Sequence, residues 1–386
     1  MVACRPTCAP IPWQLDERDA SGKFVLDHGG DANPDDSPGV LDTNDLILFM
    51  ASDAGDRVPA AALPAGSLSV TEIQVTDPRS AWRGWAYLLR YATAAPQSPI
   101  RYVRYDPAAD RLEGARVALG FAHGTPRVLA LVAGDRAGEN LLDRMKIRAS
   151  ASFLWGLITV RRNEDDVLTL PVAWHEGPIR VVRRERFWIR LSWRWRTPIF
   201  SADTAFYRDF AEMPVTLHLN FRPRLLFADV AIRVSLDFRD LDGWELETPD
   251  GGAFLRVDGD MTADKLALAR QDGRWFALHG PDVTLVQTLA LSPSLRGVRP
   301  RLYYRESRDL GDPPESVAGA LPEIGYTLSA WDQVASGDHW FAANAYALPR
   351  EQSVGEFMDR LRIPLHADAQ PLLPDSAEAA ERNRTQ

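Results

Sequence analysis

Three consecutive segments between residues 178 and 240 alternate between apolar and polar side chains. The first places Phe187, Ile189, Leu191, Trp193 and Trp195 on one face, and Arg184, Arg186, Trp188, Arg190, Ser192, Arg194 and Arg196 on the other. A period of two residues is typical of antiparallel strands with one packed and one solvated face. The pattern therefore predicts a β-sheet in the middle third of the chain and excludes long helices there.

The other two segments predict further outward side chains. In the second, Val215, Leu217, Leu219 and Phe221 share one face, and Thr216, His218, Asn220 and Arg222 share the other. In the third, Leu226, Ala228, Val230, Ile232, Val234, Leu236 and Phe238 are expected inward, with Asp229, Arg233, Ser235, Asp237 and Arg239 outward. If the three strands are neighbours, their outward side chains form one polar sheet surface.

The distribution of turn residues and the scarcity of helical periodicity predict β-strands along the whole chain of 386 residues. The 28 prolines and 26 glycines are spread throughout, and a helical spacing of apolar residues is clear only at 351–361. We expect an all-β protein, with a large antiparallel β-sandwich or supersandwich, a smaller N-terminal β unit and one short C-terminal helix. The expected units are an N-terminal β-sandwich (1–165), the supersandwich (166–350), and the short helix with a flexible tail (351–386).

The outward side chains of the middle third have chemistry suited to a sugar ligand. Arginine holds carboxylate or sulfate through paired hydrogen bonds, and an indole packs on the apolar face of a pyranose. Seven arginines against one glutamate between 178 and 200 leave an excess of six positive charges, which favours an anionic partner. The expected ligand-binding residues are Trp188, Arg190, Arg194, Asn220, Arg222 and Arg233. Alternatively, the arginines pair across strands with acids such as Glu185, Asp229 and Asp237.

Composition excludes several other classes of partner and cofactor. The 44 basic and 53 acidic side chains give a net charge of −9, which argues against general binding of nucleic acid. No apolar stretch approaches the roughly 20 residues that span a bilayer. Because phosphate-binding glycine motifs, zinc signatures and haem attachment sites are missing from the sequence, we expect no nucleotide, haem or flavin.

Both cysteines of the chain, Cys4 and Cys8, lie at its start. Three interpretations are open. Met-Val-Ala-Cys is similar to the end of a lipoprotein processing site, which would make Cys4 a lipid anchor. A disulfide between the two would indicate an oxidising compartment, and unused thiols at a frayed terminus are the third alternative. The first two predict a bacterial extracytoplasmic protein in the periplasm, on the outer surface or secreted.

An acidic segment at 27–56 contains eight aspartates and no Lys or Arg. Calcium takes six to eight oxygen ligands, which such an Asp/Asn-rich loop can supply. The expected ligands of a structural Ca²⁺ are Asp31, Asn33, Asp35, Asp42, Asn44 and Asp45. The spacing differs from an EF-hand, and a solvated acidic loop without metal is the alternative.

Several short motifs follow one another in an order that resembles a known family. They are the P-x-Q-x-D strand at 11–16 with the Asp-rich turn and apolar strand at 42–51, then Glu139-Asn140 with 144–148, then Glu176-Gly177-Pro178-Ile179-Arg180. Together they are similar to galactose-mutarotase-like β-supersandwich proteins of secreted polysaccharide-utilisation systems. The resemblance implies an extracytoplasmic supersandwich that handles carbohydrate. No residue set matches the His and Glu pair of a mutarotase, so the resemblance does not extend to that activity.

Three functions follow from these observations. We expect a carbohydrate-binding protein without catalytic activity. The first alternative is a polysaccharide (uronate) lyase, in which arginines neutralise the sugar carboxylate and His218 or Tyr207 transfers the proton. The second is a structural subunit of an envelope or surface assembly, whose arginines contact an acidic protein surface.

Overall fold

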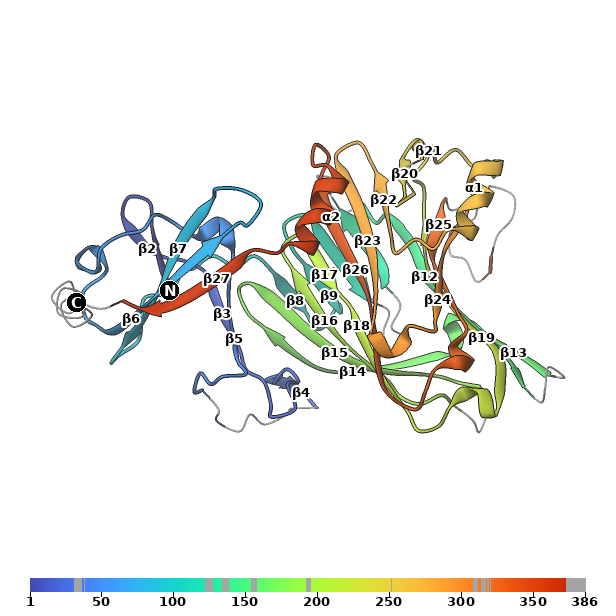
Figure 1. Ribbon diagram of the computed structural model, residues 1–386, viewed down its shortest axis with the longest axis horizontal. Coiled ribbons are helices and arrows are strands. Elements are labelled where there is room, and N and C mark those ends of the chain that lie inside the picture. The colour runs from blue at the N-terminus through green and yellow to red at the C-terminus, as the bar shows by residue number, and fades with distance from the viewer. Residues whose placement is uncertain are drawn as a thin grey trace, which may run out of the picture.

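The computed structural model describes residues 1–386 except 31–36, 38, 122–127, 134–138, 154–157, 192–195, 251, 308–311, 314–316, 318, 320 and 373–386. Antiparallel strands dominate this part of the chain, so the expected all-β class is confirmed. Figure 1 shows a small sheet of N-terminal strands beside a larger sandwich.

An eleven-stranded sheet forms one layer of the sandwich. Its strands in spatial order are β21 (Leu255–Arg256), β20 (Glu245–Glu247), β22 (Trp275–His279), β23 (Val283–Leu291), β26 (Gly337–Pro349), β17 (Phe210–Glu212), β16 (Phe200–Tyr207), β15 (Arg180–Ile189), β14 (Val167–Glu176) and β4 (His28–Gly29), while β18 (Pro214–Leu219) pairs with β16 and β26. The first and second alternating segments of the sequence thus lie in one sheet, separated by β16. We call the side of this sheet that faces away from the sandwich core its outer face.

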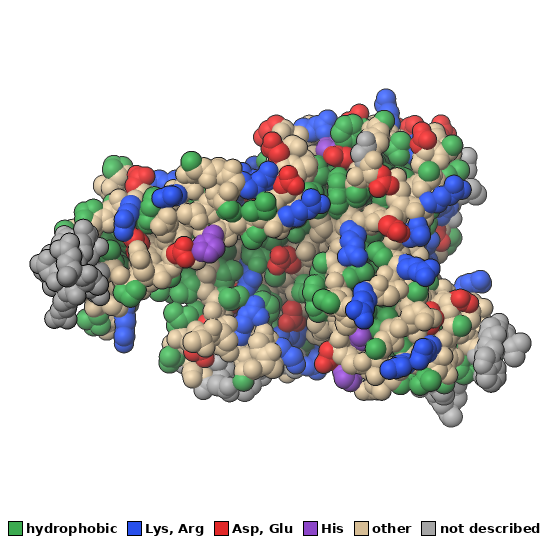
Figure 2. Space-filling model, viewed as in Figure 1, with side chains coloured by type: hydrophobic (Ala, Val, Ile, Leu, Met, Phe, Trp, Pro, Cys, Tyr) green, Lys and Arg blue, Asp and Glu red, His purple; other side chains and the backbone are tan. Residues whose placement is uncertain are grey.

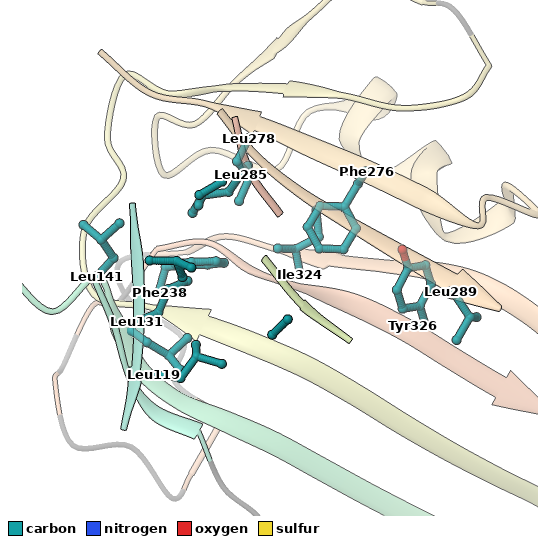
Figure 3. Close-up of a cluster of buried hydrophobic side chains, with 14 of the residues drawn as sticks. Leu119, Leu131, Leu141, Phe238, Phe276, Leu278, Leu285, Leu289, Ile324 and Tyr326 are labelled. Atoms are coloured by element: carbon teal, nitrogen blue, oxygen red, sulfur yellow. The ribbon is translucent and has the colours of Figure 1, made fainter. Parts of the chain in front are cut away.

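A five-stranded sheet forms the opposite layer. Its order is β13 (Ile158–Arg162), β12 (Leu142–Phe153), β19 (Phe227–Phe238), β25 (Glu323–Ser329) and β24 (Arg299–Arg305). Apolar side chains of both sheets meet in the core, as Figure 3 shows for Phe276 and Leu289 of one layer and Tyr326 of the other. The Phe276 and Tyr326 rings lie 5.8 Å apart, and the Tyr326 hydroxyl donates to the Gln287 carbonyl at 3.1 Å.

A four-stranded sheet adds to this core. It consists of β11 (Val128–Ala133), β10 (Val117–Phe121), β9 (Arg111–Glu113) and β8 (Arg104–Asp106). Leu112, Leu119 and Leu131 of this sheet are buried in the same apolar cluster as the sandwich. The expected boundary at residue 165 stays a prediction, but β12 before it pairs with β19 after it, so strands from both sides build the sandwich.

The N-terminal strands form their own sheet in the order β2 (Cys8–Pro10), β1 (Val2–Cys4), β7 (Arg83–Tyr91), β6 (Ser67–Thr76) and β27 (His366–Pro371). Next to it, β3 (Trp13–Asp16) pairs with β5 (Leu46–Phe49). Cys4 and Cys8 form a disulfide across β1 and β2, which is the second of the three interpretations of these cysteines.

The C-terminal helix expected at 351–361 is present as α2 (Val354–Arg362). Ser353 caps it by accepting the amide of Glu356, and Val354 is buried against β22, β23 and β26. After α2 the chain returns to the N-terminal sheet as β27, a strand that no alternation in the sequence predicts (Figure 1). A second helix, α1 (Ala263–Ala267), was also not expected. Within the described residues, no helix has the length and apolar character needed to cross a membrane.

The prediction of one continuous polar surface from three neighbouring strands is wrong. β19 lies in the five-stranded sheet, opposite β15 and β18. Its register with β12 shifts between Ser150 and Ser152, where Asp229 has a positive φ of 50°. Because a bulge of this kind reverses the alternation beyond it, Ala228, expected inward, is exposed. Leu226, also expected inward, precedes β19 at the end of the short 3₁₀ helix at Pro223–Leu225 and is 44% exposed.

Candidate functional site

The chain between β3 and β4 folds back over the outer face of the eleven-stranded sheet. Residues 18–24 form a hairpin closed by a β-bridge between Arg18 and Phe24. The Asp19 carboxylate accepts the backbone amides of Ser21 and Lys23 at 2.9 and 3.0 Å, which fixes the turn. Phe24 packs on a buried cluster of the sheet beneath it. We call this element the 18–24 hairpin.

Two motifs that are far apart in the sequence meet beside this hairpin. Arg180 donates from Nε to Oδ2 of Asp16 at 2.5 Å and from Nη1 to the Tyr207 hydroxyl at 2.6 Å. Gln14 Oε1 accepts the amides of Ile179 and Arg180 at 3.1 and 2.9 Å. Burial lowers the pKa of Arg180, but Tyr207 and Asp16 outweigh it, so that the pKa is raised and the guanidinium stays charged.

Gly177 has a steric role at this junction. A Cβ on Gly177 would lie 1.9 Å from Oε1 of Gln14, far inside van der Waals contact. A side chain at position 177 would therefore displace the Gln14 amide from the backbone of β15. Two of the motifs that carry the sequence resemblance, at 11–16 and 176–180, thus contact each other and fasten β3 to the sandwich.

Two imidazoles share one carboxylate next to the Asp16–Arg180 pair. His175 Nδ1 and His28 Nδ1 lie 3.1 and 2.8 Å from Oδ1 of Asp27, and His175 Nε2 lies 3.7 Å from Oδ1 of Asp16. The His28 ring stacks on Trp174 with centroids 5.3 Å apart. Burial opposes ionisation of Asp27, but hydrogen bonds and charge from His28 and His175 outweigh it and lower the pKa of Asp27.

A pocket of about 400 Å³ lies between the 18–24 hairpin and the outer face. Its lining residues are Arg18, Gly22, Lys23, Phe24, Arg184, Arg186, Ser201, Asp203, Pro214 and Thr216. Arg184 binds both carboxylate oxygens of Asp203 at 2.8 Å and donates to the Phe24 carbonyl at 3.1 Å. Four cationic side chains and one carboxylate, that of Asp203, therefore line the pocket. Figure 2 shows a hollow between the N-terminal strands and the sandwich, in which acidic and basic side chains gather.

A row of polar side chains continues from this pocket across three strands. Arg186 pairs with Ser201, Ser201 with Thr216, and Thr216 with Trp340 of β26. Directly paired residues have their side chains on the same face of a sheet. The indole of Trp340 is 41% exposed, so the row runs from a guanidinium through two hydroxyls to an accessible aromatic ring.

Glu212, on the same outer face, has a raised pKa. Burial raises the pKa of Glu212 above its usual value of 4.5, and the opposing charge of Arg180 is too weak to restore it. Burial likewise raises the pKa of Tyr207, against the effect of Arg180. The Tyr207 ring stacks on Phe210 with centroids 4.2 Å apart. Glu212 can therefore donate a proton at a higher pH than an ordinary carboxyl, while Tyr207 stays protonated.

Three residues proposed from the sequence lie on this outer face. Trp188 follows Arg184 and Arg186 at alternate positions of β15, and Tyr207 binds Arg180. His218 follows Thr216 on β18, and its Nδ1 lies 2.7 Å from Oδ1 of Asp338. The imidazole is 59% exposed and lies outside the set of residues that line the pocket.

The other proposed ligand-binding residues are not brought together with these. Arg190 follows the end of β15 and pairs with Asp166 at 3.3 Å. Asn220 and Arg222 are exposed after β18, where Arg222 precedes the short 3₁₀ helix η4 (Pro223–Leu225). Arg194 lies outside the described residues, as do the flanking Trp193 and Trp195.

Arg233 belongs to a buried ionic network on the far side of the five-stranded sheet. It pairs with Asp312 at 2.5 Å, and Lys146 lies 2.7 Å from Oδ2 of Asp237. The Ser235 hydroxyl donates to Glu323 at 2.6 Å. Ser235 and Asp237 were expected to face solvent, but they are 0% and 2% exposed. The chain around Asp312 contacts this face, since its carbonyl accepts from Lys146 at 2.8 Å.

The described part of the acidic segment binds its own backbone. The Asp45 carboxylate accepts the backbone amides of Arg18 and Asp42 at 3.0 and 2.9 Å. The Asp42 carboxylate accepts the backbone amide of Asn44 at 3.0 Å. The side-chain amide of Asn44 donates to the carbonyls of Arg18 and Asp19. Asp31, Asn33 and Asp35 lie outside the described residues. Among the residues that the structure describes, no cluster of three His, Cys, Asp or Glu side chains is arranged to hold a metal ion. The calcium site stays a prediction.

Sequence reasoning missed the residues that complete the pocket. Arg18, Lys23 and Phe24 lie in a segment without strand alternation, and only the turn residues at 19–22 (Asp-Ala-Ser-Gly) indicate a hairpin there. Nothing in the sequence places this hairpin over β15. Glu212 has no distinguishing neighbour in the sequence, because its raised pKa comes from burial in the folded protein.

Comparisons of the sequence with protein families and with curated proteins give no match. Among solved structures, the chain is similar to an alpha-mannosidase from Enterococcus faecalis V583, with a TM-score of 0.46 and 9% identity over 94% of this chain and 41% of that one. A second similarity is to a protein in the glycosyl hydrolase family 38 from Enterococcus faecalis, with a TM-score of 0.42 and 9% identity over 75% of this chain and 36% of that one. The chain thus spans about two fifths of these proteins. Similarities of this size assign no function to it.

Proposed function

We propose that the protein is an extracytoplasmic carbohydrate-binding protein that takes an acidic glycan in the pocket under the 18–24 hairpin. The observation that carries the proposal is the charge of this pocket of about 400 Å³, which is lined by four cationic side chains and one carboxylate, that of Asp203. The cations are Arg18, Lys23, Arg184 and Arg186. An excess of cationic side chains in a solvent-connected pocket favours an anionic ligand.

The neighbouring side chains suit the neutral part of such a ligand. Ser201 and Thr216 offer hydroxyls beside the cations, in register with Trp340. Sugars present hydroxyls on the ring edge and C–H groups on the ring face, so a hydroxyl-lined floor next to an accessible indole is complementary to a pyranose. The carboxylate or sulfate of one sugar residue would bind the arginines, and the next ring would lie on Trp340.

Calorimetric titration with trigalacturonate tests this assignment, with neutral trigalactose as the matched ligand. The acidic trisaccharide should bind and the neutral one should bind at least tenfold more weakly, because a hydrogen bond to a charged group contributes about 1.5–3 kcal/mol. Arg186→Gln should reduce affinity for trigalacturonate by a factor of about ten or more. Trp340→Ala should reduce affinity for both sugars.

Arg104→Gln is the matched control, since Arg104 is an exposed strand arginine on β8, outside the pocket. This variant should bind trigalacturonate like the unaltered protein. Equal affinities of the Arg104 and Arg186 variants would contradict the proposal. Retention of an acidic protein partner with no binding to either sugar would favour the envelope-subunit alternative instead.

One observation favours a second function, that of a uronate lyase. Elimination needs a base that removes the proton next to the sugar carboxylate and an acid that protonates the departing oxygen. Burial raises the pKa of Glu212, which suits the acid, and Arg180 and Tyr207 lie beside it. Incubation with polygalacturonate should then yield unsaturated product absorbance that Glu212→Gln abolishes and His218→Ala leaves intact. If only His218→Ala abolishes the product, His218 and not Glu212 transfers the proton. If the unaltered protein gives no product, lyase activity on this polymer is excluded.

A further inference from the structure

Two apolar cavities lie between the two sheets of the sandwich, on the opposite side of the eleven-stranded sheet from the pocket under the hairpin. The inner one has a volume of about 130 Å³ and the outer one about 170 Å³. Ile189, Phe200 and Ile232 line both, so the two cavities adjoin at these three side chains. We call these two adjoining cavities the apolar space.

The size of this space exceeds what packing defects in a core usually leave. Protein interiors are close-packed, and voids larger than a water molecule are few. An apolar cavity of about 150 Å³ lined by Leu, Ile and Phe stays dry and accepts a molecule the size of benzene. Two adjoining cavities of this order suit an elongated apolar molecule. At the inner end lies Gln287, whose side-chain oxygen has no hydrogen-bond partner among the described residues.

The outer cavity reaches the protein surface at the end of β18. Its lining includes Asn220, which is exposed, and Phe221, which is 42% exposed. Ala151 of β12 and Val160 of β13 line the same cavity from the opposite layer. The open end of the apolar space is therefore framed by strands of both sheets.

Arginines gather around this opening. Arg162 lines the outer cavity and donates from Nε to the carbonyl of Arg190 at 2.9 Å. Arg222 and Arg224 flank the lining residue Pro223 and are exposed. Asp166 pairs with Arg190 at 3.3 Å and with Arg162 at 3.8 Å, its neighbour Asp165 is exposed, and so is Asp229 between lining residues of β19. Four arginines against three aspartates leave the rim with a net positive charge, carried by Arg222 and Arg224.

We propose that this space binds the single acyl chain of an anionic amphiphile, with the chain between the sheets and the carboxylate or phosphate head at the arginine rim. An apolar channel with a cationic mouth is complementary to such a molecule in shape and in charge. A free fatty acid and a lysolipid share this chemistry. The site is separate from the proposed glycan site and does not depend on it.

Titration calorimetry with octanoate, decanoate and dodecanoate below their micelle concentrations tests the apolar part. Each added methylene that enters the channel should tighten binding about fourfold, which corresponds to the transfer free energy of one CH₂ group. Association should also show a negative heat-capacity change. Undetectable binding, or affinity that does not change with chain length, would overturn the proposal.

Head-group analogues with a constant dodecyl chain test the polar part. Dodecanoate and dodecyl phosphate should both bind, and dodecyltrimethylammonium should bind at least tenfold more weakly because its charge is repelled by the arginines. Binding of dodecanoate together with dodecyl phosphate supports the shared site. Tighter binding of lysophosphatidic acid than of oleate would identify a lysolipid as the preferred source, and the reverse order a free fatty acid. Equal binding of the cationic amphiphile would contradict the assignment of the rim.

Ala151→Phe places a ring in the outer cavity and should weaken dodecanoate binding at least tenfold. Ala267→Phe is the matched control, because Ala267 is exposed on α1 and lines neither cavity. Circular dichroism and melting temperature establish that both variants are folded. If folded Ala151→Phe binds like the unaltered protein, the chain does not enter this space. If Ala151→Phe does not fold, the chain-length series on the unaltered protein decides the question.

Discussion

Asp16 of β3 and Arg180 of β15 form a buried ion pair that joins the N-terminal strands to the sandwich. The Nε–Oδ2 distance is 2.5 Å, and the two residues are 3% and 5% exposed. Arg180 also binds Tyr207, and its guanidinium lies over the ring of Phe24 in the 18–24 hairpin, 4.8 Å from the centroid. This pair therefore helps to hold the 18–24 hairpin over the outer face. The proposed glycan site depends on that position, because the hairpin forms one wall of the pocket.

Replacing Asp16 by Asn should destabilise the protein by about 3–5 kcal/mol, because it leaves a buried guanidinium without a compensating charge. Guanidinium chloride unfolding, followed by tryptophan fluorescence, measures the loss. Asp250→Asn is the control, since Asp250 is exposed in a loop and should change stability by less than about 0.5 kcal/mol. An Asp16→Asn variant as stable as the control would mean that the pair does not stabilise the fold.

The raised pKa of Glu212 predicts a pH dependence. Burial lifts the pKa of the folded state above 4.5, so the folded protein binds this proton more tightly than the unfolded chain. The resulting contribution to stability is fully present below pH 4.5 and is lost as the pH rises through the folded pKa. Glu212→Gln removes this titration, so unfolding free energies should fall more steeply from pH 4.5 to 7 in the unaltered protein than in the variant. Parallel curves would contradict burial of this carboxyl.

The Cys4–Cys8 disulfide and a lipid anchor on Cys4 exclude each other, because both use the same sulfur. Intact mass measurement on protein purified from its native cell distinguishes them: a disulfide lowers the mass by two hydrogens, whereas a lipid adds an acyl-bearing group. If the disulfide is present, the double variant Cys4→Ser/Cys8→Ser should lose about 2 kcal/mol of stability, as expected for closing a short loop.

Calcium binding by the acidic segment predicts a higher melting temperature in millimolar calcium than in chelator. At a concentration 100 times the dissociation constant, ligand binding stabilises a protein by about 2.7 kcal/mol. Asp35→Asn should reduce this response, and its melting temperature in chelator should equal that of the unaltered protein. An unchanged midpoint on adding calcium would remove the calcium proposal and leave the solvated loop.

The sequence predicted individual strands better than their assembly. The alternation around Phe187 and Leu217 correctly identified β15 and β18, since a strand with one packed face requires that period. The same rule assigned Arg184 to the outer face, but it could not reveal that the 18–24 hairpin buries this side chain to 4% exposure. Whether a polar face of a sheet is covered depends on which distant segment of the chain packs on it. Alternation within the strand does not predict that segment.

Asp237 illustrates a second limit. Its position predicted a solvent-facing carboxylate, but Lys146 on the neighbouring strand lies 2.7 Å away, and both are buried. A charged residue can occupy the inward or covered side of a sheet if an oppositely charged side chain is buried beside it. For Asp237 this side chain is Lys146, which lies about 90 positions earlier in the sequence. Arg233 belongs to the same buried network, because it pairs with Asp312. It therefore does not share a surface with Trp188 of the other sheet.

The sequence by itself determined the β class, the strand faces and the short C-terminal helix, because these follow from local periodicity and capping. Only the tertiary structure decided which faces are open. It set the 18–24 hairpin over β15, brought Asp16 to Arg180, and placed β19 opposite β18 with an apolar space between them. These relationships arise from contacts between residues far apart in the chain, whose free energy depends on mutual burial that no local pattern encodes.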